Sequence, residues 1–527
     1  MKGRILTSLL AVMAVAGFQA QEVPAVPRLV VGLTIDQLRL DYVEAFSSIY
    51  GSRGFKRLWK EARVYRNAEY DFNQVDQASA VAAIYTGATP YLNGIVGSSW
   101  MDRYSLRLIN CVDDMSFMGI YTSESTSPHR LKVSNLSDEL MIATQGAAEV
   151  YSIAPTREMA VLAAGHASKG AFWINDDTGK WSGTTYYGTF PSWVSSYNDR
   201  QGLDFRIDDL SWAPYLPVTM YNYLPASSKQ EAFKYKFSNE RKNKYRKLKT
   251  TPYANEEVNR LVNACLNNTS IGRDYVPDLL NLAYYAGNYD HKSAAECPME
   301  MQDVYVRLDA QLGDLLDIID RKVGLSNTLF FITSTGYSDP EPMDAEVYRV
   351  PTGEFHINRC AALLNMYLAA IYGEGQYVEA HHEQEIYLNH KFIEQKNLNL
   401  PEILQRSSEF LVQFSGVKEV YSSQRLLLGT WTPELNKIKN SYHASCSGDL
   451  WVEVLPGWRI VRDHSVHVRV VRDAYASAPL FFIGWNVRPE IIHTPIKIGH
   501  IAPTLTHFMR IRAPNASSLP PLADIRK

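Results

Sequence analysis

The stretch that most constrains how this 527-residue chain folds is the nearly continuous apolar run Arg28–Ile35, RLVVGLTI, which ends at Asp36. A strand without polar–apolar alternation is typical of a central strand that is covered on both faces, as in parallel sheets. Asp36 then lies at the carboxyl end of this strand, where α/β folds place their ligands. The run therefore predicts a buried parallel sheet with a carboxylate at its functional edge.

Other segments extend this pattern. Short apolar runs predict further buried strands at Met159–Ala163, Thr328–Thr333 and Pro479–Ile483. Apolar residues recur in Gln302–Val323 with a period close to 3.6, and Gly499–Ile511 has a similar pattern, so both are predicted as helices. Strands that alternate with helices predict an α/β sandwich.

Several segments interrupt the alternation. Residues 170–252 are rich in Trp, Tyr, Ser and Pro, which predicts a loop-rich aromatic insertion. Within it, Lys234–Lys249 holds eight Lys and Arg residues against one acid, and we favour a solvated helix face over a basic ligand site. Residues 338–428 are predicted to be largely helical. Leu450–Val461 is predicted as a hairpin that turns at Pro456-Gly457.

The N-terminus has the pattern of a secretory signal peptide. Lys2 and Arg4 precede an apolar run, and Ala20 before Gln21 offers a cleavage point. We predict a signal peptide at 1–20, a mature domain at 21–527, and export to the bacterial periplasm or beyond; a buried N-terminal helix is the alternative. No later run reaches the roughly 18–20 apolar residues of a membrane span.

Charge and cysteine spacing limit the kinds of ligand. A net charge of −3 argues against nucleic acid as a partner. The five cysteines form no C-x-x-C pair, so their spacing gives no zinc signature. In an exported chain they would allow up to two disulfides. They are Cys111, Cys265, Cys297, Cys360 and Cys446.

The stretch Asp76–Trp100, DQASAVAAIYTGATPYLNGIVGSSW, adds a helix-capping Asp, an Ala-rich turn, I-Y-T-G and a G-I-V-G loop. With LVVGLTIDQLRLDY at 29–42, AGHASKGAFW at 164–173 and IAPTLTHFM at 501–509, the chain resembles the alkaline phosphatase superfamily. The resemblance is to the branch of type I phosphodiesterases, nucleotide pyrophosphatases and bacterial threonine-nucleophile alkaline phosphatases. It implies a three-layer α/β sandwich around a mostly parallel central sheet.

The resemblance also implies a site with two zinc ions about 4 Å apart, a Thr or Ser nucleophile, and polar groups that hold the phosphoryl oxygens. It places the late His ligand near Val468, beside His467. Asp36 stands at the position of the first metal ligand and matches it. Other residues stand at the remaining family positions: Gln77 at the nucleophile, Ser98 at the phosphate-binding Asn, and Thr156 and Glu158 at the Lys-x-Arg pair. Asn288 and Lys292 stand at the Asp and His of the D-Y-x-G-H element, and Thr335 and Gly336 at the Asp and His of the D-H-G element.

These replacements remove the implied chemistry, because a Gln77 carboxamide cannot be phosphorylated and Asp36 alone cannot hold two zinc ions. We therefore predict that no cofactor is bound. We also predict an inactive pseudophosphatase that serves as a scaffold or binding protein, with protein partners in the cell envelope. One alternative is an active phosphomonoesterase or phosphodiesterase with a divergent zinc site. Another is a glycan-binding module that uses the aromatic insertion.

Several nearby residues could still supply chemistry. Ser79 is a candidate shifted nucleophile, but two positions along a helix rotate it by about 200°, away from the direction of Gln77. Asp76 is predicted as a plain helix N-cap. Asp290 and His291 could rescue one metal site. The remaining histidines with metal-binding potential are His381, His382, His464 and His467.

Overall fold

The computed structural model describes residues 25–223, 232–240, 242–339, 351–429, 432–461, 468–470, 477–523 and 525–526. In these residues the main sheet has the order β21 (Glu490–Ile492), β2 (Arg63–Glu69), β20 (Ala478–Gly484), β12 (Thr328–Ser334), β1 (Leu29–Asp36), β11 (Asp278–Tyr285), β6 (Val150–Ala154), β7 (Gly170–Ile174), β8 (Trp181–Thr184) and β5 (Gly119–Ile120), with β22 (Ile496–Lys497) beside β2. Its centre is β1 (Leu29–Asp36), which runs parallel to both β11 (Asp278–Tyr285) and β12 (Thr328–Ser334). The carboxyl ends of these three strands therefore meet at one edge.

The sequence of β1 explains its central place. All eight residues are buried, with Leu33 and Ile35 in the core on one face of the sheet and Val30 in the core on the other. Gly32 allows close packing, since a Cβ at this position would lie 2.5 Å from the ring of Phe331. A strand with two dry faces must be apolar on both, which confirms the prediction made from its unbroken run.

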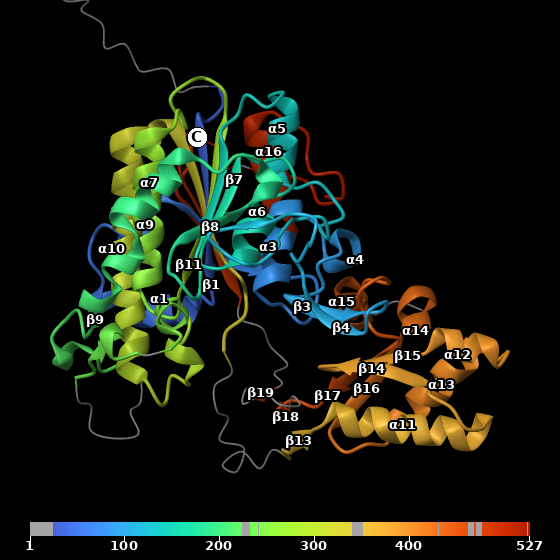
Figure 1. The fold of residues 1–527 in the computed structure, drawn as a ribbon. Helices are drawn as coiled ribbons and strands as arrows, with labels where there is room; N and C mark the ends of the chain where they lie inside the picture. Colours follow the sequence, from blue (N-terminus) through green and yellow to red (C-terminus); the bar gives the residue numbers. More distant parts are fainter. Residues whose placement is uncertain are drawn as a thin grey trace, which may run out of the picture.

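Helices cover both faces of the sheet (Figure 1). The core on one side includes α9 (Tyr253–Asn268) and α10 (Pro298–Lys322). The core on the other includes α3 (Gln77–Thr86), α6 (Arg157–Ala164) and α16 (Ile501–Met509). This arrangement is the predicted three-layer sandwich, and α10 and α16 confirm the two predicted helices.

The strand predictions had mixed outcomes. Those at Thr328–Thr333 and Pro479–Ile483 are confirmed by β12 and β20 (Ala478–Gly484), although β20 is antiparallel to β12. Met159–Ala163 was wrong, because it lies inside α6; the strand of this region is β6 (Val150–Ala154). A short apolar run does not distinguish a buried strand from a buried helix turn.

The aromatic segment is less separate from the sheet than predicted. Residues 170–252 begin with β7 (Gly170–Ile174) and β8 (Trp181–Thr184), which both belong to the main sheet, followed by α7 (Ser192–Gln201). The remainder consists mostly of short helical turns. Three of its basic residues form local ion pairs, Lys244–Asp208, Lys247–Glu240 and Lys249–Asp176. These pairs agree with a solvated face.

The segment predicted as largely helical contains a second sheet. Its antiparallel strands have the order β14 (Val378–His382), β15 (Glu385–Leu388), β17 (Leu450–Val454) and β16 (Val417–Ser422). The helices α11 (Ile357–Tyr372), α12 (His390–Gln395), α13 (Leu400–Leu411) and α14 (Ser423–Leu428) accompany them. This smaller unit therefore has its own apolar core.

The predicted hairpin at Leu450–Val461 was wrong. Its two halves, β17 and β18 (Arg459–Val461), are both strands, but they belong to different sheets. β17 pairs with β15 and β16, whereas β18 pairs with β13 (Glu354–Phe355) and β19 (Val468–Val470). Each strand therefore pairs with other strands and not across the Pro456-Gly457 turn.

Two other predictions concern covalent and membrane features. The five cysteines are buried free thiols, so the structure contains neither of the disulfides that their number allowed. No helix in the described part of the chain is long and apolar enough to cross a membrane. The signal peptide predicted at 1–20 lies outside the described residues.

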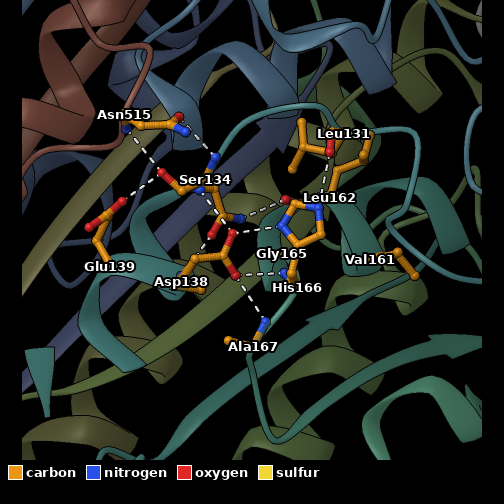
Figure 2. A network of polar contacts seen from close by, with 12 residues as sticks. Leu131, Ser134, Asp138, Glu139, Val161, Leu162, Gly165, His166, Ala167 and Asn515 are labelled. Atoms are coloured by element: carbon orange, nitrogen blue, oxygen red, sulfur yellow. Dashed lines mark hydrogen bonds and ion pairs between the residues drawn. The ribbon is translucent and has the colours of Figure 1, made fainter. Parts of the chain in front are cut away.

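A polar network joins α5 (Leu136–Ala143) to the turn after α6, as Figure 2 shows. His166 lies between two acceptors: its Nδ1 is 2.8 Å from the carboxylate of Asp138, and its Nε2 is 3.0 Å from the carbonyl oxygen of Leu131. Asp138 also accepts the backbone N–H groups of His166 and Ala167. Two acceptors favour the imidazolium form, which donates from both nitrogens.

We expect this network to stabilise the fold more at low pH. Burial lowers the pKa of His166, but the hydrogen bond and charge of Asp138 outweigh burial and raise it above 6.5. The stabilisation is then complete below pH 6.5 and is lost as the pH rises through the folded-state pKa. In urea unfolding, His166→Gln should lose about 1 kcal/mol more at pH 5.5 than at pH 9.5. The exposed His493→Gln is the control, and an equal loss at both pH values would contradict the expectation.

Candidate functional site

The site is centred on Asp36, whose buried carboxylate joins three elements at the carboxyl edge of the sheet. Its Oδ2 accepts a 2.8 Å hydrogen bond from the side-chain amide of Gln77, the first residue of α3. Its Oδ1 accepts a 2.9 Å bond from the hydroxyl of Thr335, which directly follows β12. Positions 299 residues apart in sequence therefore meet, as the family motifs predicted.

The hydrogen bonds continue beyond Asp36. The hydroxyl of Thr156, at the N-terminus of α6, donates to the amide oxygen of Gln77 over 2.8 Å. The backbone N–H of Gln37 donates to the hydroxyl of Thr335 over 2.9 Å. Gln77 is thus a bridge between a hydroxyl and a carboxylate, with both ends of its amide in use.

Burial governs the protonation of Asp36. Desolvation raises its pKa to about 6, although hydrogen bonds from Thr335, Gln77 and Tyr337 oppose the shift. The nearby charge of Asp339 raises the pKa further. The carboxylate is therefore ionised at neutral pH. Its described partners are neutral hydrogen-bond donors and do not include a cation.

The N-terminus of α3 is closed by a capping box. Asp76 Oδ1 accepts bonds from the N–H (2.9 Å) and the hydroxyl (2.8 Å) of Ser79, and the same hydroxyl bonds to the N–H of Asp76. The predicted N-cap is confirmed. Ser79 is fully buried in this role, so the structure gives no support to it as a shifted nucleophile.

The residues at the phosphate-binding positions bond to other groups of the chain. Ser98 donates to Asp76 Oδ2 from both its N–H (2.6 Å) and its hydroxyl (2.7 Å). Glu158, in the first turn of α6, accepts a 2.5 Å bond from the side chain of Asn110. Glu158 therefore presents a carboxylate where the resemblance implies a cation.

The loop after β11 holds the next positions. Asn288 is buried, and its carbonyl oxygen accepts the hydroxyl of Tyr285 over 2.8 Å. Lys292 is exposed, with its ammonium 5.8 Å from the centre of the Tyr289 ring. Lys292 therefore gives Asp36 no described ion pair.

The candidates for a rescued metal site have other partners. His291 Nδ1 lies 3.0 Å from Asp339 Oδ2, and the side-chain amide of Gln37 donates to the other oxygen of Asp339. Asp290 and His291 both have positive φ, as residues of a tight turn. His381 and His382 lie in β14 of the smaller sheet. His464 and His467 lie outside the described residues.

Gly336 shows why a zinc pair does not fit these residues. It has φ +72°, and a Cβ built there would lie 2.4 Å from the ring of Tyr70. Tyr70 is itself fixed by a 2.8 Å bond from its hydroxyl to the carbonyl of Ser334. An imidazole cannot stand at 336 without moving this ring. Across the described ranges no three His, Cys, Asp or Glu side chains are grouped so that they could hold a metal ion.

Comparison with known proteins identifies the family. Residues 30–474 match the model of type I phosphodiesterases and nucleotide pyrophosphatases. The chain belongs to this family. Alkaline phosphatase PafA of Elizabethkingia meningoseptica is 27% identical, with 98% of each chain covered. Alkaline phosphatase PhoV of Synechococcus elongatus is 26% identical over 95% of this chain and 93% of its own. The crystal structure of wild-type PafA gives a TM-score of 0.83 at 25% identity, covering 95% and 99% of the two chains.

These relatives correct the functional prediction. They are named as alkaline phosphatases and match almost the whole chain, which contradicts an inactive scaffold or binding protein and supports the alternative of a phosphatase or phosphodiesterase with a divergent site. Family and relatives indicate a hydrolase of the phosphatase and phosphodiesterase type. That no cofactor is bound, and that the replaced residues have lost the metal pair, stay predictions.

Sequence reasoning missed the groups that fill the site. The ring of Tyr70 over Gly336, the bond from Thr156 to Gln77, and the contact of Ser98 with Asp76 join distant segments. The sequence showed only that several family positions carry other polar residues, and this does not reveal which groups they bond to.

We expect removal of the Asp36 charge to stabilise the protein. Because the pKa of Asp36 is raised, its favourable contribution is complete below about pH 4 and is lost as the pH rises through about 6. Asp36→Asn avoids this loss, and Gln77 can rotate its amide so that Thr156 becomes the acceptor. The unfolding free energy should rise by up to about 3 kcal/mol at pH 8 and change little at pH 4.

Denaturant unfolding at the two pH values measures this effect. Asp199→Asn, an exposed change in α7, is the control for a lost negative charge. A loss of stability at pH 8 in Asp36→Asn would show that the hydrogen bonds of the carboxylate outweigh its desolvation.

Proposed function

We propose that this protein hydrolyses phosphate esters at the Asp36 edge of the sheet, with a divergent site that does not use a pair of zinc ions. The observation that carries the proposal is the meeting of Asp36, Gln77, Thr156 and Thr335 in a chain that matches alkaline phosphatases over nearly its whole length. The site lies where α/β folds bind their ligands.

The side chains limit the reaction to direct attack by water. Gln77 cannot carry a phosphoryl group, so no covalent intermediate forms at the nucleophile position. Water forms the new P–O bond and gives its proton to Asp36, while the bond to the leaving oxygen breaks. An aryl ester then leaves as phenolate, and Asp36 passes its proton to solvent. Asp36 accepts side-chain hydrogen bonds from Gln77, Thr335 and Tyr337, and the four lone pairs of a carboxylate leave one for the water.

Gln77 and Thr335 then act as positioning residues. Their bonds hold the plane of the Asp36 carboxylate, and the bond from Thr156 keeps the amide nitrogen of Gln77 directed at Asp36. We further propose that the enzyme is exported, on the basis of the charged and apolar pattern of residues 1–20. We also propose that it has protein partners in the cell envelope.

Hydrolysis assays with Asp36→Asn test the proposal. The full mature chain should release phenolate from aryl phosphate esters, and Asp36→Asn should be at least about 100-fold slower, since it removes the proton acceptor. Chelator treatment should leave the rate unchanged, and purified protein should contain far less zinc than two equivalents. The Asp199→Asn control should keep the wild-type rate.

Two results would contradict parts of this picture. Turnover no faster than that of Asp36→Asn would refute the hydrolase. Turnover that chelators abolish and zinc restores would show that the reaction uses zinc. It would contradict the zinc-free site but not the proposed hydrolase activity.

A further inference from the structure

The carboxylate of Asp76 is saturated by four donors from two segments of the site. Oδ1 accepts the N–H and the hydroxyl of Ser79 at 2.9 and 2.8 Å, in the first turn of α3. Oδ2 accepts the N–H and the hydroxyl of Ser98 at 2.6 and 2.7 Å, from the loop before β3 (Ser99–Asp102). An N-cap needs only the first pair, so the contact with Ser98 goes beyond capping.

The same donors are those that a phosphoryl group would use. The free N–H groups and the dipole of a helix N-terminus attract anions. Ser98 supplies two further donors beside this end of α3. Because Asp76 uses both segments, the chain's own carboxylate occupies the place and the hydrogen bonds of an incoming phosphoryl oxygen.

The charges around Asp76 also disfavour a bound phosphate. Asp36 is in contact with the residue after Asp76, and Glu158 lies in the first turn of α6. The neighbouring cation, Arg157, bonds to Asp113 at 2.9 Å and lies 3.7 Å from Glu124. A second negative charge near Asp76 is strongly disfavoured where the surroundings are partly buried.

We propose that Asp76 determines the charge specificity of the site: its carboxylate fills the phosphoryl subsite between α3 and Ser98, excludes doubly charged groups such as phosphomonoesters and inorganic phosphate, and leaves singly charged phosphate esters as substrates. This inference rests on the proposed function for its substrates, but the exclusion of phosphate rests only on the contacts of Asp76 and the charges around it. It also makes the enzyme insensitive to the phosphate concentration around it.

Binding of inorganic phosphate to the full mature chain, measured by calorimetry without any substrate, tests the exclusion. Wild-type protein should show no saturable binding at millimolar phosphate. Asp76→Ser keeps a good N-cap but withdraws the carboxylate from Ser98, so its affinity for phosphate should rise at least about tenfold. Asp76→Gly, which is also tolerated at an N-cap, empties the same position and should behave alike if the Ser variant does not fold.

Asp102→Ser is the matched control. Asp102 accepts the N–H and the hydroxyl of Ser105 at 2.9 and 2.6 Å, the same Asp-x-x-Ser pattern in an exposed turn outside the site. It removes an equal charge and should leave phosphate binding unchanged. Saturable binding to the wild type, no gain in either folded Asp76 variant, or an equal gain in Asp102→Ser would each overturn the proposal.

A second readout links the exclusion to turnover. The ratio of diester to monoester hydrolysis should fall at least about tenfold from wild type to Asp76→Ser, since the doubly charged monoester gains more from the lost repulsion than the singly charged diester. An unchanged ratio in a variant that binds phosphate would overturn the substrate assignment. Absence of any turnover would refute the proposed hydrolase. The binding of phosphate to the Asp76 variants would still test the exclusion, because that measurement needs no turnover.

Discussion

A single buried carboxylate organises the functional edge of this protein. Asp36 ends the central strand of the main sheet and is reached by side chains from the start of α3 and from the residue after β12. An unpaired buried charge is costly unless donors surround it, so Gln77 and Thr335 are needed for the fold to keep Asp36 at all. Gln77 in turn depends on Thr156, which brings α6 into the same set of contacts.

The replaced positions form a consistent set. Where the family resemblance implies a nucleophile, metal ligands and cations, this chain has an amide, hydroxyls and carboxylates that satisfy one another. Asp76 with Ser98 and Glu158 with Asn110 show this pairing within the phosphate-binding region. Full satisfaction of buried polar groups is expected of a folded protein, and it explains how these side chains are accommodated at one edge of the sheet.

Prediction from the sequence succeeded where burial alone decides the structure. The eight-residue apolar run of β1, which ends at a carboxylate, and the 3.6-residue period over more than twenty residues of α10 were both predicted correctly. The run at Met159–Ala163 permits either a strand or a helix, and the contacts of α6 with α3 and the sheet selected the helix. The strand β14 was missed because its sequence, VEAHH, lacks an apolar pattern. Motif spacing placed the site residues at one edge, but it could not show their hydrogen-bond partners, which come from segments distant in sequence.

The ring of Tyr70 above Gly336 couples two positions that lie far apart in sequence. A side chain at 336 collides with the ring, and the backbone there has a conformation that favours glycine. A ligand can therefore be introduced at 336 only together with a smaller residue at 70. That second change would leave a cavity and remove the hydrogen bond from Tyr70 to the carbonyl of Ser334. Any redesign of this edge thus has to change both positions at once.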